Sequence, residues 1–222
     1  MEKIRKHTRV NDILLGPLER PTLKWLAANM PAWVTPDTCT LVGTLGALLT
    51  LISYGLSNIN PIFLWLASLG FFINWLGDSL DGTLARYRHI ERPRYGYYID
   101  HTMDVVCQVM IFLGLGLTPY ISFNVACLAL TSYLLLSVLV YIRTYVVGEF
   151  KISFGNLGPT ESRAVAVLLN SAMYFFGMQS IMLGRITISL YDIFVAAIAL
   201  LLTGFFVNTA LREARRLAAL GE

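Results

Sequence analysis

Apolar side chains fill long runs of this sequence, and short polar or turn-forming segments divide them. An α-helix needs about 20 mostly apolar residues to cross the hydrocarbon core of a bilayer. Pro61 favours the first turn of one such run, and Pro119 ends another. The pattern predicts six transmembrane helices, over residues 38–57, 61–86, 95–117, 120–147, 161–181 and 187–210.

The first 35 residues follow a different pattern. Ile, Leu and Trp side chains alternate there with Lys and Arg, and the apolar core of a cleavable signal peptide is lacking. A basic amphipathic segment of this kind lies on a membrane surface. The sequence therefore predicts an all-α membrane protein with an N-terminal interfacial amphipathic segment (1–35), a six-helix transmembrane domain (36–211) and a charged tail (212–222).

The composition agrees with a surface that faces lipid. The chain has 222 residues, of which 56% are hydrophobic and 14% charged, and its mean hydropathy is +0.62. Soluble domains carry about 25% charged residues. The three cysteines lie in apolar runs without the spacing of a zinc site or disulfide framework, so we interpret them as small buried side chains.

Basic residues are unevenly distributed over the predicted loops. Sixteen of the 17 Lys and Arg residues fall on one side of the six-span topology, and only Arg185 falls on the other. The positive-inside rule then predicts that both termini and two polar loops are cytoplasmic, at the inner (plasma) membrane if the cell is bacterial. The net charge of +3 fits an anionic membrane surface better than a nucleic acid.

Four aspartates stand at the cytoplasmic ends of two predicted spans. Asp78 and Asp81 are three residues apart, and Asp100 and Asp104 are four apart, so each pair shares a helix face. A short loop joins the two spans, which we expect to be antiparallel neighbours that bring the four carboxylates together. A charged side chain inside a membrane is energetically costly and therefore indicates a function. Carboxylates this close together repel one another, and some would stay protonated unless a cation binds. Oxygen ligands favour Mg²⁺, Mn²⁺ or Ca²⁺.

A salt-bridge cluster is the structural alternative for these acids. Four arginines lie in or beside the connecting loop: Arg86, Arg88, Arg92 and Arg94. Ion pairing does not explain the small residues Gly82, Ala85 and Gly96, which would let a large ligand approach the backbone. His101 is turned about 100° from Asp100 on a helix, which favours a structural role.

The acids and small residues form one pattern, which runs Asp78-x-x-Asp81-Gly82-x-x-Ala85-Arg86 and, after nine intervening residues, Gly96-x-x-x-Asp100-x-x-x-Asp104. It resembles the signature of the CDP-alcohol phosphotransferase (CDP-alcohol phosphatidyltransferase) family, DxxDGxxAR…GxxxDxxxD, at all eight defining positions. The resemblance implies an enzyme of phospholipid synthesis. Such an enzyme transfers a substituted phosphate from a CDP-linked alcohol to the hydroxyl of a second alcohol and releases CMP.

The resemblance also implies roles for individual residues. The metal ligands would be Asp78, Asp81, Asp100 and Asp104, which would hold Mg²⁺ or Mn²⁺ as two ions. Asp104 would in addition be the general base. The CDP pocket would include Asp78, Asp81, Gly82, Ala85, Arg86 and Gly96. The resemblance further implies a homodimer.

The segment Trp33 to Thr40 is similar to a Pro-Asn-x-x-Thr segment of the same family that lies near the nucleotide. Asp37 stands here in place of the Asn. Asp37 and Thr40 are therefore further candidates for the CDP site. The alternative is a helix that starts at Pro36 and is capped by Thr35 or Asp37.

The acceptor alcohol is left open by the sequence. Arg143, Lys151 and Arg163 are candidates to bind the phosphate of a phosphorylated acceptor, or else anionic lipid headgroups. Glu161 is a candidate to recognise an amine-bearing acceptor such as ethanolamine, choline or serine. The lipid partner can be either the CDP donor or the acceptor.

Two other functions fit the acids alone. A divalent-cation transporter can use intramembrane carboxylates, but transporters often contain internal repeats, and none is evident here. An intramembrane prenyltransferase also binds diphosphate through Asp-rich motifs and metal, with a different Asp pattern. The arginine and small residues of the signature favour the nucleotide site over both.

Overall fold

The computed structural model describes residues 8–9, 16–147, 149–150, 158–183 and 186–220. This part of the chain contains seven helices: α1 (Gly16–Asn29), α2 (Pro36–Leu56), α3 (Phe63–Tyr87), α4 (Pro93–Gly116), α5 (Phe123–Val147), α6 (Pro159–Phe176) and α7 (Leu190–Ala219). It also contains two short strand pairs: β1 (Thr8–Arg9) runs parallel to β2 (Glu149–Phe150), and β3 (Ser180–Leu183) runs antiparallel to β4 (Ile186–Ser189). The all-α class is confirmed.

Five of the helices are long and apolar enough to cross a membrane: α2, α3, α4, α5 and α7. The fifth predicted span, over 161–181, is shorter than expected. Its helix, α6, ends at Phe176, where Gly177 adopts φ 62°, a conformation that glycine reaches without strain. The β3–β4 hairpin then occupies residues that the hydrophobic pattern had assigned to the ends of two spans. α7 continues unbroken through the predicted tail to Ala219.

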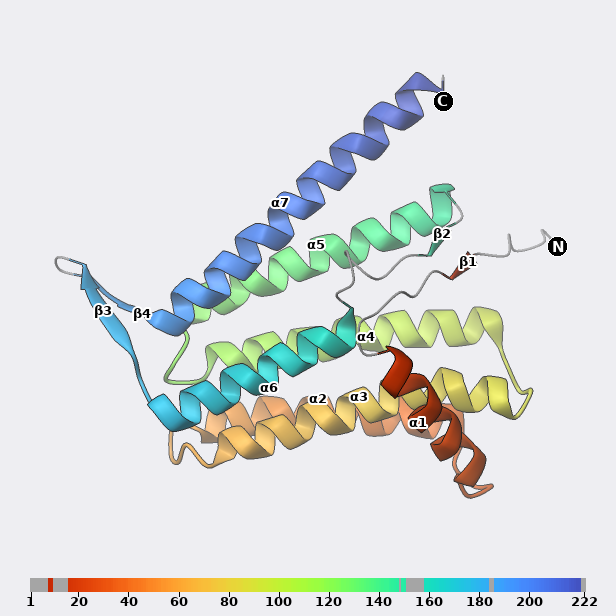
Figure 1. The fold of residues 1–222 in the computed structure, drawn as a ribbon, viewed down its shortest axis with the longest axis horizontal. Helices are drawn as coiled ribbons and strands as arrows, with labels where there is room; N and C mark the ends of the chain where they lie inside the picture. Colours follow the sequence, from red (N-terminus) through yellow and green to blue (C-terminus); the bar gives the residue numbers. More distant parts are fainter. Residues whose placement is uncertain (1–7, 10–15, 148, 151–157, 184–185, 221–222) are drawn as a thin grey trace.

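The helices form a bundle with two distinct ends. Figure 1 shows α1, the β1–β2 pair and the α3–α4 connection at one end, and the β3–β4 hairpin at the other. We call the first the α1 end. α2 packs against both α3 and α4, α6 packs on α3, and α5 packs on α4 and α7. α1 lies across α3.

The helices that carry the aspartates, α3 and α4, face each other across a pocket, but they do not pack closely together as expected for neighbouring helices. α2 contacts α3 and α4 extensively, whereas contact between α3 and α4 themselves is sparse over their described residues. The segment that connects α3 to α4 is short. It keeps the adjoining helix ends close together, but it does not require the two helices to pack along their length. The separation leaves room for a pocket between α2, α3 and α4.

Glycines bring the backbones of α2 and α3 into contact. A Cβ atom placed on Gly46 would lie 2.5 Å from the backbone nitrogen of Asn74 and 2.8 Å from the carbonyl oxygen of Gly70. One placed on Gly77 would lie 2.5 Å from the carbonyl oxygen of Cys39. Small residues permit this close approach of membrane helices, and backbone atoms cannot move aside as a side chain can.

The close contact predicts a large difference between two glycine substitutions. Gly77→Ala should destabilise the protein by about 1–3 kcal/mol, the usual cost of overpacking. Gly55→Ala in α2 is the matched control, because a Cβ there meets no described atom within 4 Å. Thermal unfolding of the purified protein in detergent measures both. Equal melting temperatures for the two variants would contradict the proposed packing role of Gly77.

Polar side chains fasten α6 to its neighbours. The hydroxyl of Tyr54 in α2 donates to Oδ1 of Asn170 at 2.9 Å, and Nδ2 of Asn170 donates to Ser68 of α3 at 3.1 Å. All three side chains are buried. Buried polar groups need such partners, so these bonds set the position of α6 along α3.

Candidate active site

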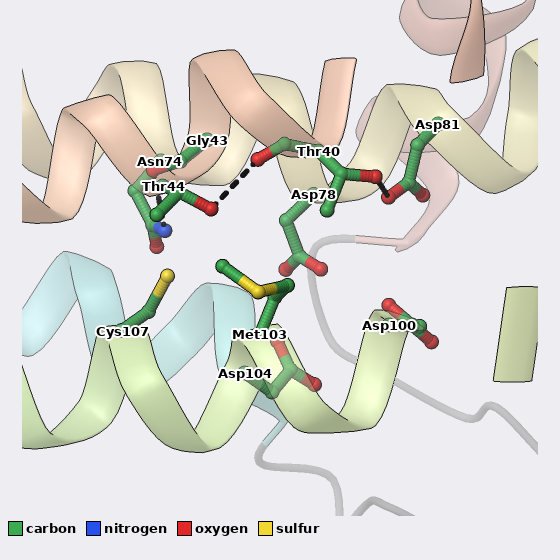
Figure 2. A pocket seen from close by; sticks show the side chains of 10 residues that line it. All are labelled: Thr40, Gly43, Thr44, Asn74, Asp78, Asp81, Asp100, Met103, Asp104 and Cys107. Carbon is green, nitrogen blue, oxygen red and sulfur yellow. Dashed lines mark hydrogen bonds between the residues drawn. The ribbon is translucent and has the colours of Figure 1, made fainter. Parts of the chain in front are cut away.

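The four predicted aspartates line one pocket at the side of α2. Figure 2 shows Asp78 and Asp81 of α3 facing Asp100 and Asp104 of α4. The complete lining is Thr40, Gly43, Thr44, Asn74, Asp78, Asp81, Asp100, Met103, Asp104 and Cys107. The structure therefore brings together the carboxylates that the spacing placed on two helix faces.

Asp81 is oriented by α2 and by its own helix. The hydroxyl of Thr40 donates to Oδ2 of Asp81 at 2.7 Å, and the backbone N–H of Gly82 donates to Oδ1. The Thr40 contact is drawn in Figure 2. Because both oxygens are engaged, the carboxylate is held in one orientation. Thr40, a sequence candidate for the CDP site, thus acts on the pocket through Asp81.

Asp78 is paired with an arginine from α6. Arg163 donates from one terminal guanidinium nitrogen to Oδ2 of Asp78 at 2.7 Å, and from Nε to Oδ1 of Asn74 at 3.0 Å. Nδ2 of Asn74 donates in turn to the carbonyl oxygen of Gly43 at 3.0 Å. The Arg163 side chain is only 17% exposed. These bonds connect α6, α3 and α2 directly behind Asp78.

Asp100 and Asp104 share their surroundings with His101. One ligand atom each from Asp100, His101 and Asp104 lies within 4.8 Å of the others. Nδ1 of His101 lies 3.4 Å from Oδ2 of Asp100. The imidazole stacks on Tyr141 of α5, with ring centroids 5.0 Å apart. It also lies in a T-shaped arrangement with Tyr97, with ring centroids 4.1 Å apart.

The donor set fits a hard divalent cation. Carboxylate oxygens predominate, and Mg²⁺ is commonly held by a few carboxylates together with water and substrate phosphate. The three groups on α4 are close enough to share one ion, and the two aspartates of α3 lie across the same pocket. Arg163 balances part of the negative charge on the α3 side.

The small residues of the signature lie beyond this lining. Gly82, Ala85 and Arg86 follow Asp81 towards the α1 end, and Gly96 precedes Asp100 there. The three atoms nearest to a Cβ on Gly82 would all belong to the guanidinium group of Arg86, and a Cβ on Gly96 would meet no described atom within 4 Å. Packing within the described chain therefore does not require glycine at either position. The position beside Gly96 is open, and the one beside Gly82 is occupied by the end of the flexible Arg86 side chain.

Asp37 lies at the start of α2 and forms an ion pair. Its Oδ1 is 2.5 Å from the guanidinium group of Arg92, in the α3–α4 connection, and both side chains are about half exposed. Thr35 is the N-cap of α2: its hydroxyl accepts the backbone N–H of Thr38 at 3.2 Å. Asp37 thus braces the α3–α4 connection and is not part of the pocket lining.

Of the four acceptor candidates, the structure brings Arg163 to the pocket. Arg143 instead forms an ion pair with Glu213 of α7 at 2.9 Å. The carboxylate of Glu161 accepts the backbone N–H of Gly158 at 2.8 Å and is buried. Gly158 has no side chain to cap α6, so Glu161 supplies part of the capping. Lys151 lies outside the described residues.

Five lining residues were not predicted from the sequence: Gly43, Thr44, Asn74, Met103 and Cys107. The helical period could have identified them, as three examples show. Asn74 precedes Asp78 by four residues, Thr44 follows Thr40 by four, and Cys107 follows Asp104 by three, so each shares a face with a predicted residue. Cys107 is buried, as expected, but it also lines the pocket.

Comparison with known proteins connects this pocket to a family. The family described as CDP-alcohol phosphatidyltransferase matches residues 33–205. The chain is similar to cholinephosphotransferase 1 of Mus musculus, with 27% identity over 180 residues, 78% of this chain and 44% of the relative. The Gallus gallus protein of the same name is 29% identical over 172 residues, 74% of this chain and 50% of the relative.

A bacterial protein is similar over a shorter region. The phosphatidylinositol phosphate synthase of Cutibacterium acnes is 39% identical over 95 residues, 40% of this chain and 41% of the relative. The chain spans about half or less of the length of these curated relatives. The family match over 33–205 includes the whole pocket and Arg163. This chain belongs to the CDP-alcohol phosphatidyltransferase family.

Proposed function

We propose that this protein is a membrane enzyme of phospholipid synthesis. It transfers a substituted phosphate from a CDP-alcohol to the hydroxyl of a second alcohol and releases CMP. One observation carries the proposal: Asp78, Asp81, Asp100 and Asp104 line one pocket in a chain that belongs to this family. The transporter and the prenyltransferase alternatives lack support from the family match.

Two ions of Mg²⁺ or Mn²⁺ are the proposed cofactors. Asp78 and Asp81 on one side of the pocket, and Asp100 and Asp104 on the other, would hold them. Such ions neutralise the charge of a diphosphate and stabilise the attacking and leaving oxygens of a transfer. Thr40 and Arg163 contribute by fixing the orientation of Asp81 and Asp78.

The CDP-alcohol would approach from the α1 end. Gly82, Ala85 and Gly96 are small residues there, the position beside Gly96 is open, and Arg86 supplies an exposed positive charge. Thr40 lines the pocket itself, and Asp37 lies one helical turn before it in α2. These residues form the proposed CDP site.

Asp104 is the proposed general base. The hydroxyl of the acceptor gives its proton to the Asp104 carboxylate, and its oxygen bonds to the phosphorus that carries the donor alcohol. The bond from that phosphorus to the bridging oxygen breaks, and CMP leaves with the bond's electron pair. Asp104 lies among lining residues of three helices, so a bound hydroxyl can reach it.

The acceptor class depends on groups near the pocket. Glu161 is committed to capping α6 and Arg143 to Glu213, so neither supports acceptor recognition in this arrangement. Arg163 is already paired with Asp78. It would therefore contribute its charge to a phosphorylated acceptor while it remains in that ion pair. The named relatives represent both possibilities, a choline phosphate transfer and a phosphatidylinositol phosphate synthesis.

The proposed setting is a membrane crossed six times, with α6 as the additional span and the α1 end in the cytoplasm. The distribution of basic residues supports this orientation. α1 would lie at the lipid surface, because Leu18 and Trp25 point outward with exposed fractions of 74% and 65%, and Arg20 and Lys24 are exposed on the same helix. A homodimer is part of the proposal by family resemblance.

A CMP-release assay tests the proposed function. The purified full chain should release CMP only when a CDP donor, an acceptor and Mg²⁺ or Mn²⁺ are all present, and a chelator should abolish release. One set of reactions pairs CDP-diacylglycerol with glycerol 3-phosphate, inositol, inositol phosphate or serine. The other pairs CDP-choline or CDP-ethanolamine with diacylglycerol. Metal transport into vesicles without CMP release from any pair would contradict the proposal and favour a transporter.

A further inference from the structure

Glu19 of α1 connects three helices through one carboxylate. The hydroxyl of Ser79 in α3 donates to its Oε1 at 3.2 Å, and the hydroxyl of Thr160 in α6 donates to its Oε2 at 2.9 Å. The contacts span 60 and 141 residues of sequence. Neither the helical pattern nor the family signature indicated this residue.

Both hydrogen bonds lead to Asp78. Ser79 is the next residue along α3, so its position and that of Asp78 are fixed together. Thr160 precedes Arg163 by one turn of α6, and Arg163 holds Oδ2 of Asp78 at 2.7 Å. Glu19 thus contacts the two helices that form the Asp78–Arg163 pair, on the outer side of that pair.

The packing of α1 keeps Glu19 in place. Leu23 and Ala27 follow it at intervals of four residues and therefore share its face. Both are buried in a cluster with Leu80 and Leu84 of α3. These apolar contacts fix α1 along α3. They therefore hold the Glu19 carboxylate where Ser79 and Thr160 can donate to it.

A simpler role for Glu19 has to be separated from this one. It lies in the first turn of α1, where an acidic side chain stabilises the positive end of the helix dipole. That role needs the charge but not the two hydroxyl donors. The positioning role needs the donors.

We propose that Glu19 is a positioning residue for the transfer reaction: by accepting hydrogen bonds from Ser79 and Thr160, it fixes α3 and α6 relative to each other and so maintains the Asp78–Arg163 pair. The inference rests on the proposed function, since it assigns Asp78 a role at the metal. It means that α1, which lies outside the signature, helps to position residues of the active site.

Two measurements on the purified full chain test the role: Mn²⁺ binding by electron paramagnetic resonance, and steady-state CMP release. Glu19→Ala should weaken Mn²⁺ binding about 10-fold and lower kcat by a similar factor, the size seen when groups behind metal ligands are removed. The KM for the CDP substrate should stay within about twofold, since Glu19 lies behind Asp78 and not at the proposed CDP site.

Matched variants identify the cause. Ser79→Ala combined with Thr160→Val should reproduce both losses with Glu19 intact, and adding Glu19→Ala should cause no further loss, because all three changes remove the same contacts. Glu19→Gln should restore most of both values, since an amide can accept from one hydroxyl and donate to the other. Lys24→Ala, an exposed change on α1, should match the wild type.

The outcomes distinguish this inference from the proposed function. A wild-type protein that binds Mn²⁺, with Glu19→Ala equal to it in binding and kcat, would overturn the role of Glu19 alone. Normal behaviour of the Ser79→Ala/Thr160→Val variant beside a defective Glu19→Ala would assign Glu19 to the helix dipole and also overturn it. A wild-type protein without Mn²⁺ binding would overturn the proposed function and this inference together.

Discussion

Asp104→Asn should lower turnover by about 1,000-fold and leave binding of the CDP substrate within a few-fold of the wild type. Loss of a general base typically costs 10²- to 10⁴-fold. Asparagine has nearly the same shape and can still fill the space beside Asp100 and His101, but it cannot take the acceptor's proton. A carboxylate oxygen of Asp104 lies within 4.8 Å of a possible ligand atom of each neighbour, so we expect part of the loss to come from weaker metal binding.

The measurement combines CMP release with equilibrium binding of the CDP substrate. Asp192→Asn is the matched control, because Asp192 is also an aspartate of a long apolar helix. Its carboxylate accepts the backbone N–H of Ser122 at 2.7 Å, away from the pocket lining. That variant should retain turnover. Near-normal turnover of Asp104→Asn would exclude Asp104 as the base.

Arg163→Gln should lower kcat/KM by 10- to 100-fold, the range found when a group behind a metal ligand is lost. The arginine holds Asp78 and Asn74 with two differently directed donors. Glutamine is shorter and uncharged, so Asp78 would lose its ion pair and part of its orientation. Arg163→Lys should recover only part of the activity, because a single ammonium group cannot reproduce the planar fork of donors.

Two kinetic readouts separate the roles considered for Arg163. If it positions Asp78, the concentration of Mg²⁺ that gives half-maximal activity changes in Arg163→Gln. If it binds only the acceptor, the KM for the acceptor rises while the metal dependence is unchanged. Arg94→Gln, at an exposed position of the α1 end, is the control for general loss of positive charge. Activity of Arg163→Gln within twofold of the wild type would contradict both roles.

Local periodicity accounts for what could be predicted from the sequence. Helical spacing placed Asp78 with Asp81, and Asp100 with Asp104, on common faces, and the structure has all four in one pocket. Apolar run lengths predicted five helices that the structure contains as candidate spans. These features depend on residues three to 25 positions apart, and a helix imposes such relations whatever packs against it.

The end of α6 shows where that reasoning stops. An apolar run continues past Phe176, but the chain turns at Gly177 and forms the β3–β4 hairpin. Hydrophobicity alone does not distinguish a helical turn from a strand over so few residues. The hydrophobic pattern gives no information about the positive φ of Gly177, which is a property of the backbone.

The partners of the charged side chains were decided by tertiary structure. Arg143 pairs with Glu213, Arg163 reaches Asp78, and Glu19 joins α3 to α6. Each contact depends on which helices pack together, and glycines that let α2 approach α3 help to determine this. The sequence by itself determined that four carboxylates share two helix faces in a membrane protein. Only the packing of α1, α2 and α6 decided which groups hold those carboxylates, because helical period specifies a face and not its neighbour.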